Sequence, residues 1–352
     1  MPPKGFHNAG RILIRSANWV GDAIMTTPAI RAIRRNFPSA RITLLAKPWV
    51  APVFEYNPDI DDIMIYQTAE RHGGWAGLYH LAQDVRRQRF DLAILFQNAF
   101  EAALLSFMAG IPRRMGFTTD GRTALLTDRI RTWRPLKKGH LIEYYLGLPL
   151  GAGMTLHGTR LTLVITPEER RLARCYMTDK KLAGDLVIGL NPGATFGTAK
   201  RWLPDRFAEL GRRLIAGHKA RVLIFGAPNE ASLGRWLADE IGDGAVNLCG
   251  QTSLRQAICL IEQCDLFVTN DSGLMHVAAA LDIPQLAIIG PTDPVATGPI
   301  NPASRIVHFP GVCEFSPCLK AHCPIADHRC MTAVSVDLVA REARALLSGE
   351  TP

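Results

Sequence analysis

Short runs of apolar residues alternate with amphipathic, helix-length stretches along the whole chain. Four runs in the first half have the length and composition of buried strands, at 11–15, 42–46, 63–66 and 92–96. Helical periodicity separates them, notably at 28–36 and 78–89. Strands that alternate with helices predict parallel sheets covered by helices, so we expect an α/β fold.

The same pattern restarts after a charged, helix-prone stretch at 166–184. Strand-like runs follow at 186–190, 221–225, 266–269 and 285–289, with helical stretches at 204–214, 230–241, 254–263 and 273–281. A last amphipathic helix is expected at 335–347, with Ser335 as its N-cap. We therefore predict two Rossmann-like domains, 1–170 and 186–352, joined by a linker at 171–185.

Composition limits the class of protein. Hydrophobic residues make up 47% and charged residues 20% of 352 residues, which suits two globular cores. No apolar run reaches the ~20 residues of a membrane span, and the first ten residues lack an apolar signal region, so a cytoplasmic protein is expected. The net charge of +8 indicates an acidic partner. Since there is no basic tail, a phosphorylated small or lipidic substrate is favoured over nucleic acid.

The segment after the first strand of the second half, Asn191 to Trp202, is rich in glycine, hydroxyl and basic side chains. Backbone N–H groups, the Thr195 hydroxyl and the Lys200 ammonium suit a diphosphate. The segment is not a Walker A loop, because Lys200 is not followed by Ser or Thr. A surface loop with a solvated lysine is the alternative interpretation.

A second segment of this kind follows the strand at 266–269 and leads into a helix. Ser272 and Gly273 place a hydroxyl and free N–H groups at the positive end of that helix, where anions bind. Asp271 would repel a phosphate, so we expect it to bind sugar hydroxyls or to cap the helix. His276, one turn further on, either faces the ligand or packs as a structural residue.

Two more strand ends of the second half carry weaker signals. Glu230 follows the strand at 221–225 and is expected to bind ribose hydroxyls or to cap its helix. Thr252 precedes the helix at 254–263 and is placed to pack on a base. Together, these strand ends predict a nucleotide-binding domain.

The first half carries one carboxylate and several cations near its strand ends. Asp22 follows the first strand, behind a glycine that permits a tight turn, and is interpreted either as a general base or as a helix cap. A set of cations and one amide is expected to bind phosphate or carboxylate, with solvated surface side chains as the alternative. This set comprises Lys47, Asn98, Arg113, Arg114 and Arg122.

Four segments, taken in order, resemble the ADP-heptose:lipopolysaccharide heptosyltransferases, glycosyltransferase family 9, and in particular the type II members that add the second heptose. They are WVGD at 19–22, AGIPR at 109–113, PGATFGTAKRW at 192–202 and VTNDSGLMHVAAAL at 268–281. The resemblance covers about residues 11–300. The last two segments are long enough that chance agreement is implausible.

The resemblance implies a GT-B fold, two Rossmann-like domains facing across a cleft, and inversion at the anomeric carbon. It implies Asp22 as the catalytic base and Lys200 as the residue that steadies the departing diphosphate. Contacts to an ADP-heptose donor are implied for Thr195, Lys200, Glu230, Thr252, Asp271, Ser272 and Gly273, and His276 lies in the same motif. No metal is expected to be essential. The implied acceptor is a phosphorylated lipid A–Kdo–heptose, which places the protein peripherally at the inner face of the inner membrane.

A cluster of cysteines near the end departs from some members of the family. Cys313, Cys318, Cys323 and Cys330 have His322 and His328 between them. One interpretation is a structural metal site, most simply zinc, although the spacings differ from the C-x2-C pairs of common zinc sites. Disulfides, which a reducing cytoplasm disfavours, and four unrelated thiols are the others. We expect a structural metal or a redox-sensitive staple.

Other functions compete with this hypothesis. Within enzymes they are the addition of the first or third heptose, or transfer from another nucleotide sugar by the same fold. A non-catalytic nucleotide-sugar sensor would not need Asp22 and Lys200. A nicotinamide oxidoreductase would need a G-x-G-x-x-G fingerprint, which is missing from the first strand's end. The oligomeric state stays open.

Overall fold

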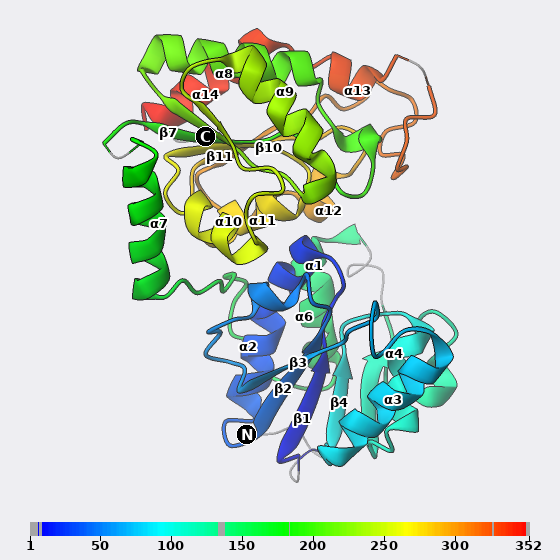
Figure 1. Cartoon of the computed structure of the whole chain (residues 1–352). Helices are drawn as coiled ribbons and strands as arrows, with labels where there is room; N and C mark the ends of the chain where they lie inside the picture. Colours follow the sequence, from blue (N-terminus) through cyan, green and yellow to red (C-terminus); the bar gives the residue numbers. More distant parts are fainter. Residues whose placement is uncertain (1–5, 7–8, 133–137, 183, 326, 350–352) are drawn as a thin grey trace. The chain divides into compact units, whose positions relative to one another are not determined.

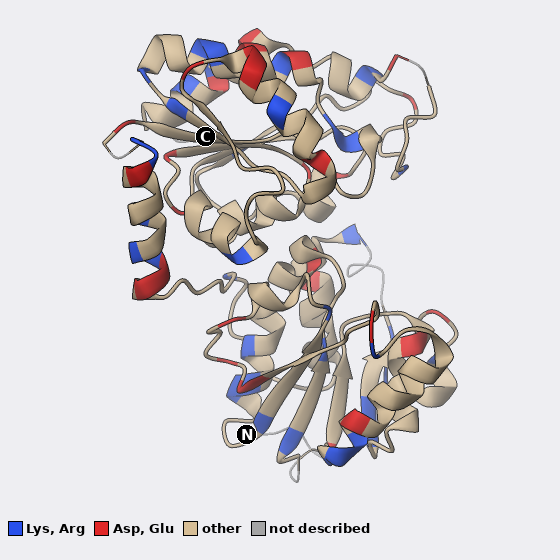
Figure 2. Ribbon diagram, in the orientation of Figure 1, with Lys and Arg blue, Asp and Glu red and all other residues tan. Residues whose placement is uncertain are grey.

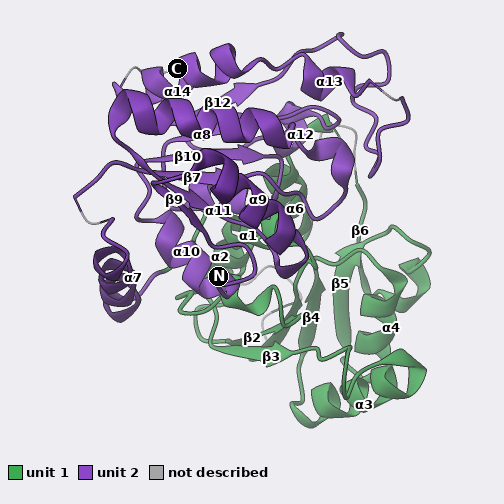
Figure 3. Cartoon of the chain, turned by 45° about the horizontal axis from the view of Figure 1, so that its top comes forward, with its two compact units in different colours: residues 1–164 green, residues 165–352 purple. Residues whose placement is uncertain are grey.

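The chain forms two compact units, residues 1–164 and 165–352 (Figure 1, Figure 3). The computed structural model describes residues 6, 9–132, 138–182, 184–325 and 327–349. Each unit holds a parallel sheet of six strands between layers of helices. The predicted α/β class is therefore confirmed, as is each of the eight predicted strands, within one residue at either end.

Unit 1 is ordered β3-β2-β1-β4-β5-β6 across its sheet. The strands are β1 (Arg11–Arg15), β2 (Arg41–Ala46), β3 (Asp62–Ile65), β4 (Leu92–Leu95), β5 (Arg113–Phe117) and β6 (Asp128–Ile130). The helices are α1 (Val20–Met25), α2 (Thr27–Asn36), α3 (Gly74–Arg87), α4 (Phe100–Met108) and α6 (Leu141–Gly151). Helices α1, α2 and α6 pack together on one face, and α3 and α4 pack together on the other.

Unit 2 repeats this topology with the order β12-β11-β10-β7-β8-β9. The strands are β7 (Val187–Asn191), β8 (Arg221–Ile224), β9 (Ala245–Asn247), β10 (Leu266–Asn270), β11 (Gln285–Ile288) and β12 (Ser304–Val307). The helices are α7 (Pro167–Asp179), α8 (Pro204–His218), α9 (Ala231–Ile241), α10 (Leu254–Ile261), α11 (Gly273–Ala280), α12 (Pro294–Thr297), α13 (Arg329–Thr332) and α14 (Val336–Leu347). Helices α8, α9 and α14 lie on one face, and α10 and α11 on the other (Figure 1).

The strand order locates the ligand site in each unit. The direction of chain progression reverses between β1 and β4 in unit 1, and between β7 and β10 in unit 2. In open parallel sheets, ligands bind outside the carboxyl ends of the strands at such a reversal. The residues that follow these four strands are therefore expected to contact a ligand.

The segment predicted as a linker begins inside a helix of unit 2. Helix α7 starts with a capping box, in which Thr166 Oγ1 accepts from Glu169 N at 3.2 Å and Glu169 Oε2 accepts from Thr166 N at 2.8 Å. Two ion pairs then join α7 to the region of α10, Glu169 with Arg255 and Arg170 with Glu262. These contacts explain why residues 165–179 belong to unit 2.

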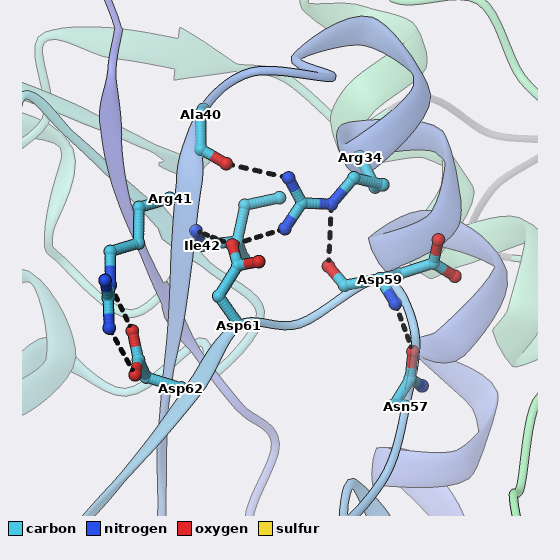
Figure 4. Close-up of polar contacts among 8 residues, drawn as sticks. All are labelled: Arg34, Ala40, Arg41, Ile42, Asn57, Asp59, Asp61 and Asp62. Carbon is cyan, nitrogen blue, oxygen red and sulfur yellow. Dashed lines mark hydrogen bonds and ion pairs between the residues drawn. The ribbon is translucent and has the colours of Figure 1, made fainter.

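The amino end of the unit 1 sheet is closed by polar contacts (Figure 4). The Arg34 guanidinium on α2 donates to Asp61 Oδ2 at 2.5 Å and to Ala40 O at 2.7 Å. Arg41 of β2 pairs with Asp62 of β3 at 2.6 Å, a largely exposed contact that is screened by solvent and contributes little stability. Because structural pairs occupy this edge, the carboxyl ends of the strands remain for ligands.

Charge and hydropathy of the finished fold agree with the composition. Lys and Arg are spread over both units and do not form one basic tract (Figure 2). Among the described residues, no helix is both long and apolar enough to cross a membrane. The predicted cap of the terminal helix is confirmed, since Ser335 Oγ accepts from Leu338 N at 3.2 Å.

Candidate functional site

Two buried asparagines organise the carboxyl ends of β7 and β10 in unit 2. Asn191 Nδ2 donates to Thr269 Oγ1 at 2.9 Å and to Ser272 Oγ at 2.6 Å. Asn270 Nδ2 donates to Pro192 O at 2.7 Å. The loop after β7 is thereby tied to the residues that start α11. Sequence reasoning quoted both asparagines within motifs but gave them no role.

Lys200 and Asp271 meet at this point. Lys200 Nζ lies 2.7 Å from Asp271 Oδ2, and the Thr292 hydroxyl donates to the same oxygen at 2.6 Å. The Phe196 ring lies 5.5 Å from the ammonium. Asp271 is almost fully buried and Lys200 is only slightly exposed, so the pair interacts strongly. Thr292 was missed from the sequence, where its position four residues beyond β11 was the available signal.

The N-terminus of α11 adds a second anion-attracting group. Ser272 is the N-cap residue, in an extended conformation, and the helix begins at Gly273. Both are half-buried, so the first N–H groups can be reached by a ligand. The structure thus brings Lys200, Asp271, Ser272 and Gly273 together, as the motifs predicted. His276 is buried within the helix.

Glu230 lies deep beside the start of the 192–202 loop. Its Oε2 accepts from Ala227 N at 2.9 Å, and its Oε1 lies 3.3 Å from Arg201 Nη2. A Cβ at Gly193 would lie 2.1 Å from Glu230 Oε1, so only glycine fits there. The carboxylate caps its own turn, and a ribose contact stays a prediction.

Two residues that were predicted to bind the ADP-heptose donor lie at the surface of unit 2. The Thr195 side chain is exposed, and Thr252 is half-buried just before α10, whose cap is Ser253. Their predicted contacts to diphosphate and base are compatible with this exposure and stay predictions.

Asp22 lies in the first turn of α1 in unit 1, at the carboxyl end of β1. It is half-buried, and the helix begins after Trp19, which is extended and makes no side-chain cap. Burial raises the pKa of Tyr145, and the nearby Asp22 charge adds to this effect. The role of Asp22 as a general base stays a prediction.

The predicted acceptor residues divide into two places. Asn98 and Arg122 lie at the carboxyl edge, where Arg122 Nη2 donates to Asn98 Oδ1 at 2.9 Å and Asn98 Nδ2 donates to Tyr144 Oη at 2.8 Å. Arg122 is fully buried, and burial lowers its pKa to about 10. It also donates to the carbonyls of Phe117 and Gln97. The buried Arg122 therefore fixes the orientation of the Asn98 side chain.

Arg113 and Arg114 were predicted to lie after or near strand ends, together with the other cations of the first half, but they lie at the start of a strand instead. They are the first residues of β5, so they lie toward the opposite edge of the sheet. Arg113 pairs with Asp128 and lies 3.6 Å from the Phe6 ring, while Arg114 Nε donates to Leu125 O at 2.6 Å. Their predicted role in acceptor binding stays untested.

The cysteine cluster does not form the predicted zinc site. Among the residues that the structure describes, no group of three or more His, Cys, Asp or Glu side chains is arranged to hold a metal ion. Burial, with a contribution from three nearby thiols, raises the pKa of Cys330 to about 11, so this thiol is protonated at neutral pH. His328 Nε2 lies 2.7 Å from Ala199 O, and His322 Nδ1 lies 3.1 Å from Thr198 Oγ1. These histidines contact the 192–202 loop.

Comparison with known proteins identifies relatives over the whole chain. The model of glycosyltransferase family 9 (heptosyltransferase) matches residues 78–328. Lipopolysaccharide heptosyltransferase 2 of Salmonella typhimurium is 30% identical over 355 residues, with 97% of this chain and 99% of that protein covered. The lipooligosaccharide heptosyltransferase 2 of Haemophilus influenzae is 31% identical, with 85% and 88% covered.

Solved structures agree. The ADP-heptose lipopolysaccharide heptosyltransferase II of E. coli superposes with a TM-score of 0.79 at 29% identity, with 97% of this chain and 99% of that one covered. A glycosyltransferase family 9 protein of Veillonella parvula reaches 0.85 at 24% identity, with 99% of each chain covered, which supports the fold alone. The family match, the full-length relatives and the shared fold lead to one conclusion: the chain belongs to glycosyltransferase family 9, the heptosyltransferases.

Proposed function

We propose that the chain transfers L-glycero-D-manno-heptose from ADP-heptose to a lipopolysaccharide inner core that already carries one heptose, with inversion at the anomeric carbon. The observation that carries this proposal is the Lys200–Asp271 pair beside the N-terminus of α11, in a family member about 30% identical to type 2 heptosyltransferases over nearly its full length.

The donor binds unit 2 in this proposal. The diphosphate accepts hydrogen bonds from Lys200, from the Ser272 hydroxyl and from the first N–H groups of α11. As Lys200 turns to the diphosphate, the Asp271 carboxylate becomes available to the heptose hydroxyls. Glu230 and Thr252 contact the ribose and the base, and Thr195 contacts the diphosphate from the loop.

Unit 1 supplies the base. Asp22 removes the proton from the acceptor hydroxyl, and the oxygen attacks the anomeric carbon as the bond to ADP breaks. Negative charge grows on the leaving diphosphate, where Lys200 and the α11 N-terminus stabilise it. Asn98, held by Arg122 and Tyr144, is placed at the same sheet edge to bind an acceptor hydroxyl.

A lipid acceptor requires that the protein reach a membrane surface, and we propose that α3 does so. Trp75 and Tyr79 are 79% and 54% exposed and, four residues apart, share one face of the helix. Arg86 and Arg87 lie in its last turn (Figure 2). A helix that carries exposed aromatic rings near its start and arginines at its end suits the interface of an anionic bilayer.

Sedimentation with phosphatidylglycerol vesicles tests this surface. The Trp75→Ala/Tyr79→Ala variant should lose most of the bound fraction, whereas Trp236→Ala, which removes an exposed ring of unit 2, should bind like wild type. Equal binding by the double variant and wild type would rule α3 out.

The function is tested by ADP release from ADP-heptose in the presence of a monoheptosylated acceptor. Wild type should release ADP, and Asp22→Ala should be slower by ~100-fold or more, as expected for loss of a general base. Asp22→Asn, which keeps the size of the side chain, should be equally slow. Release only with an acceptor that lacks heptose would assign the first transfer step, and binding without release would favour a sensor.

A further inference from the structure

Two buried cations lie side by side at the carboxyl edge of the unit 1 sheet. Arg15 is the last residue of β1, and Lys47 directly follows β2. Tyr66 directly follows β3. Because these three strands are neighbours and parallel, their ends converge, although the residues are far apart in sequence.

Both cations lie close to the aromatic ring of Tyr66. Lys47 Nζ is 3.3 Å from the ring centroid, and Arg15 Cζ is 5.4 Å from it. Arg15 is 2% and Lys47 7% exposed, so both charges are withdrawn from bulk water. Lys47 keeps the greater exposure and is the one that a ligand would meet first.

The cations have donors left over. Arg15 Nη1 donates to Ser16 O at 2.8 Å and Nη2 to Asn18 Oδ1 at 2.9 Å, but its buried Nε has no partner. The Lys47 ammonium contacts the Tyr66 ring. It makes no hydrogen bond to another group among the residues that the structure describes. Buried N–H donors normally have a hydrogen-bond acceptor, but Arg15 Nε has none within the described structure. The Lys47 ammonium likewise has no acceptor among the described residues.

The charges around the pair do not balance. One carboxylate, Glu101 in the first turn of α4, lies within electrostatic range of both cations, and it also bonds to Tyr66. Burial, followed by repulsion from Arg15, lowers the pKa of Lys47 to about 8. An uncompensated buried cation is unfavourable, and binding an anion removes that penalty.

The pair lies beneath the loop that carries the proposed base. Arg15 holds Asn18, and Asn18 O accepts from the exposed Trp49 at 2.9 Å. Two residues after Asn18, the loop enters α1, whose first turn contains Asp22. A group bound at the cations would therefore be held near the residue that activates the acceptor hydroxyl.

We propose that Arg15 and Lys47 form a binding site for an anionic oxygen group of the acceptor, a phosphoryl or carboxylate group, which positions the acceptor for Asp22. This inference rests on the proposed function. The acceptor oxygens accept from Lys47 Nζ, and the buried Arg15 guanidinium adds its positive charge to the site.

The test is a binding titration on full-length protein saturated with ADP, so that the donor site is filled and no turnover occurs. Calorimetry with the monoheptosylated acceptor is compared among wild type, Lys47→Met and Lys47→Arg. Methionine keeps the length of the side chain without its charge. The Kd should rise at least tenfold for Lys47→Met, the loss expected for a charged hydrogen bond, and stay within threefold of wild type for Lys47→Arg. An unchanged Kd for Lys47→Met would overturn the proposal.

The pH dependence provides a check that needs no variant. The wild-type Kd should rise as the pH passes about 8, where Lys47 loses its proton, and the Lys47→Arg Kd should not. Of the other groups facing the site, Arg15 has a pKa of about 10 and Tyr66 has a pKa raised by burial, so neither changes charge there. A flat wild-type profile would overturn the assignment.

Three probes separate the sources of the anion. A dephosphorylated acceptor that loses the Lys47 effect identifies a phosphoryl group, and one that keeps it identifies a carboxylate. Inorganic phosphate that binds wild type and not Lys47→Met supports the site even if no heptose is transferred. Transfer that is normal in Lys47→Met, with unchanged KM, rejects this inference and leaves the proposed function intact.

Discussion

We propose that Lys200 stabilises both the leaving diphosphate and the fold, and a double-mutant cycle can separate these two roles. Lys200→Met removes the cation that lies 2.7 Å from the Asp271 carboxylate. In the proposed function the same cation stabilises the leaving diphosphate. A charge about 4 Å from a developing phosphate charge is worth about 4 kcal/mol at an effective dielectric of about 20. Removal of one such stabilising donor typically lowers kcat by about 10²–10³-fold, and we predict a loss of that size.

The same substitution should also destabilise the fold. Asp271 would keep a buried charge with the Thr292 hydroxyl as its remaining partner, at a cost of about 2 kcal/mol. In Lys200→Met/Asp271→Asn the buried charge is gone, so most of the stability should return. The activity should not return, because the diphosphate still lacks its cation.

The assays are the free energy of unfolding from urea titration and kcat from ADP release. Arg305→Met serves as the matched control, since Arg305 pairs with Glu342 at 2.7 Å in the same unit, on an edge strand. It should lose stability and keep its kcat. A double variant that regained activity together with stability would refute the catalytic role of Lys200, as would a kcat within fivefold of wild type for the single variant.

Three further predictions follow from single contacts. Arg255 holds the pKa of Glu169 at about 2, so this pair stabilises the fold above the unfolded pKa near 4.5 and loses its effect as the pH falls toward 2. Arg255→Met should cost roughly 2 kcal/mol in a urea titration at pH 7 and about a quarter of that at pH 2.5, where Glu169 is still partly ionised in the fold; an equal cost at both would contradict this. Gly193→Ala should cost about 1–3 kcal/mol, because its Cβ would meet Glu230, whereas Gly217→Ala in α8, with open space around it, should be neutral or slightly stabilising. In the proposed function Lys200 and the α11 N-terminus neutralise the diphosphate, so EDTA should leave the rate of ADP release unchanged; a rate lost with EDTA and restored by added Mg²⁺ would contradict that role.

Seven of the eight strands that sequence reasoning found are buried almost throughout, and the eighth, β3, is a half-buried edge strand with a recognisable apolar run. The missed strands β6, β9 and β12 are short strands at the edges of their sheets, and the missed β5 lies one strand inside the edge but begins with two arginines. Such strands need no continuous apolar run, so periodicity distinguishes them poorly from loops. The misplacement of Arg113 and Arg114 follows directly from the missing β5.

Local motifs predicted the placement of residues at the carboxyl edge of the unit 2 sheet better than at that of unit 1. Lys200, Asp271 and Ser272 lie in two continuous segments, and strand-end logic brought those segments together. The Arg15–Lys47 pair depends on three strands joined by register, and on a tyrosine that no motif marks. Likewise, the cysteine spacing could not show that His322 and His328 turn to the 192–202 loop.

The central claim is the transfer of heptose to an acceptor that already carries one. Mass spectrometry of the lipid product, after incubation with ADP-heptose, tests it most directly in wild type and Asp22→Asn. The account predicts that wild type adds one heptose to the monoheptosylated acceptor and none to the acceptor without heptose, and that Asp22→Asn adds almost none to either. An unchanged lipid mass with every acceptor, or full transfer by Asp22→Asn, would contradict it.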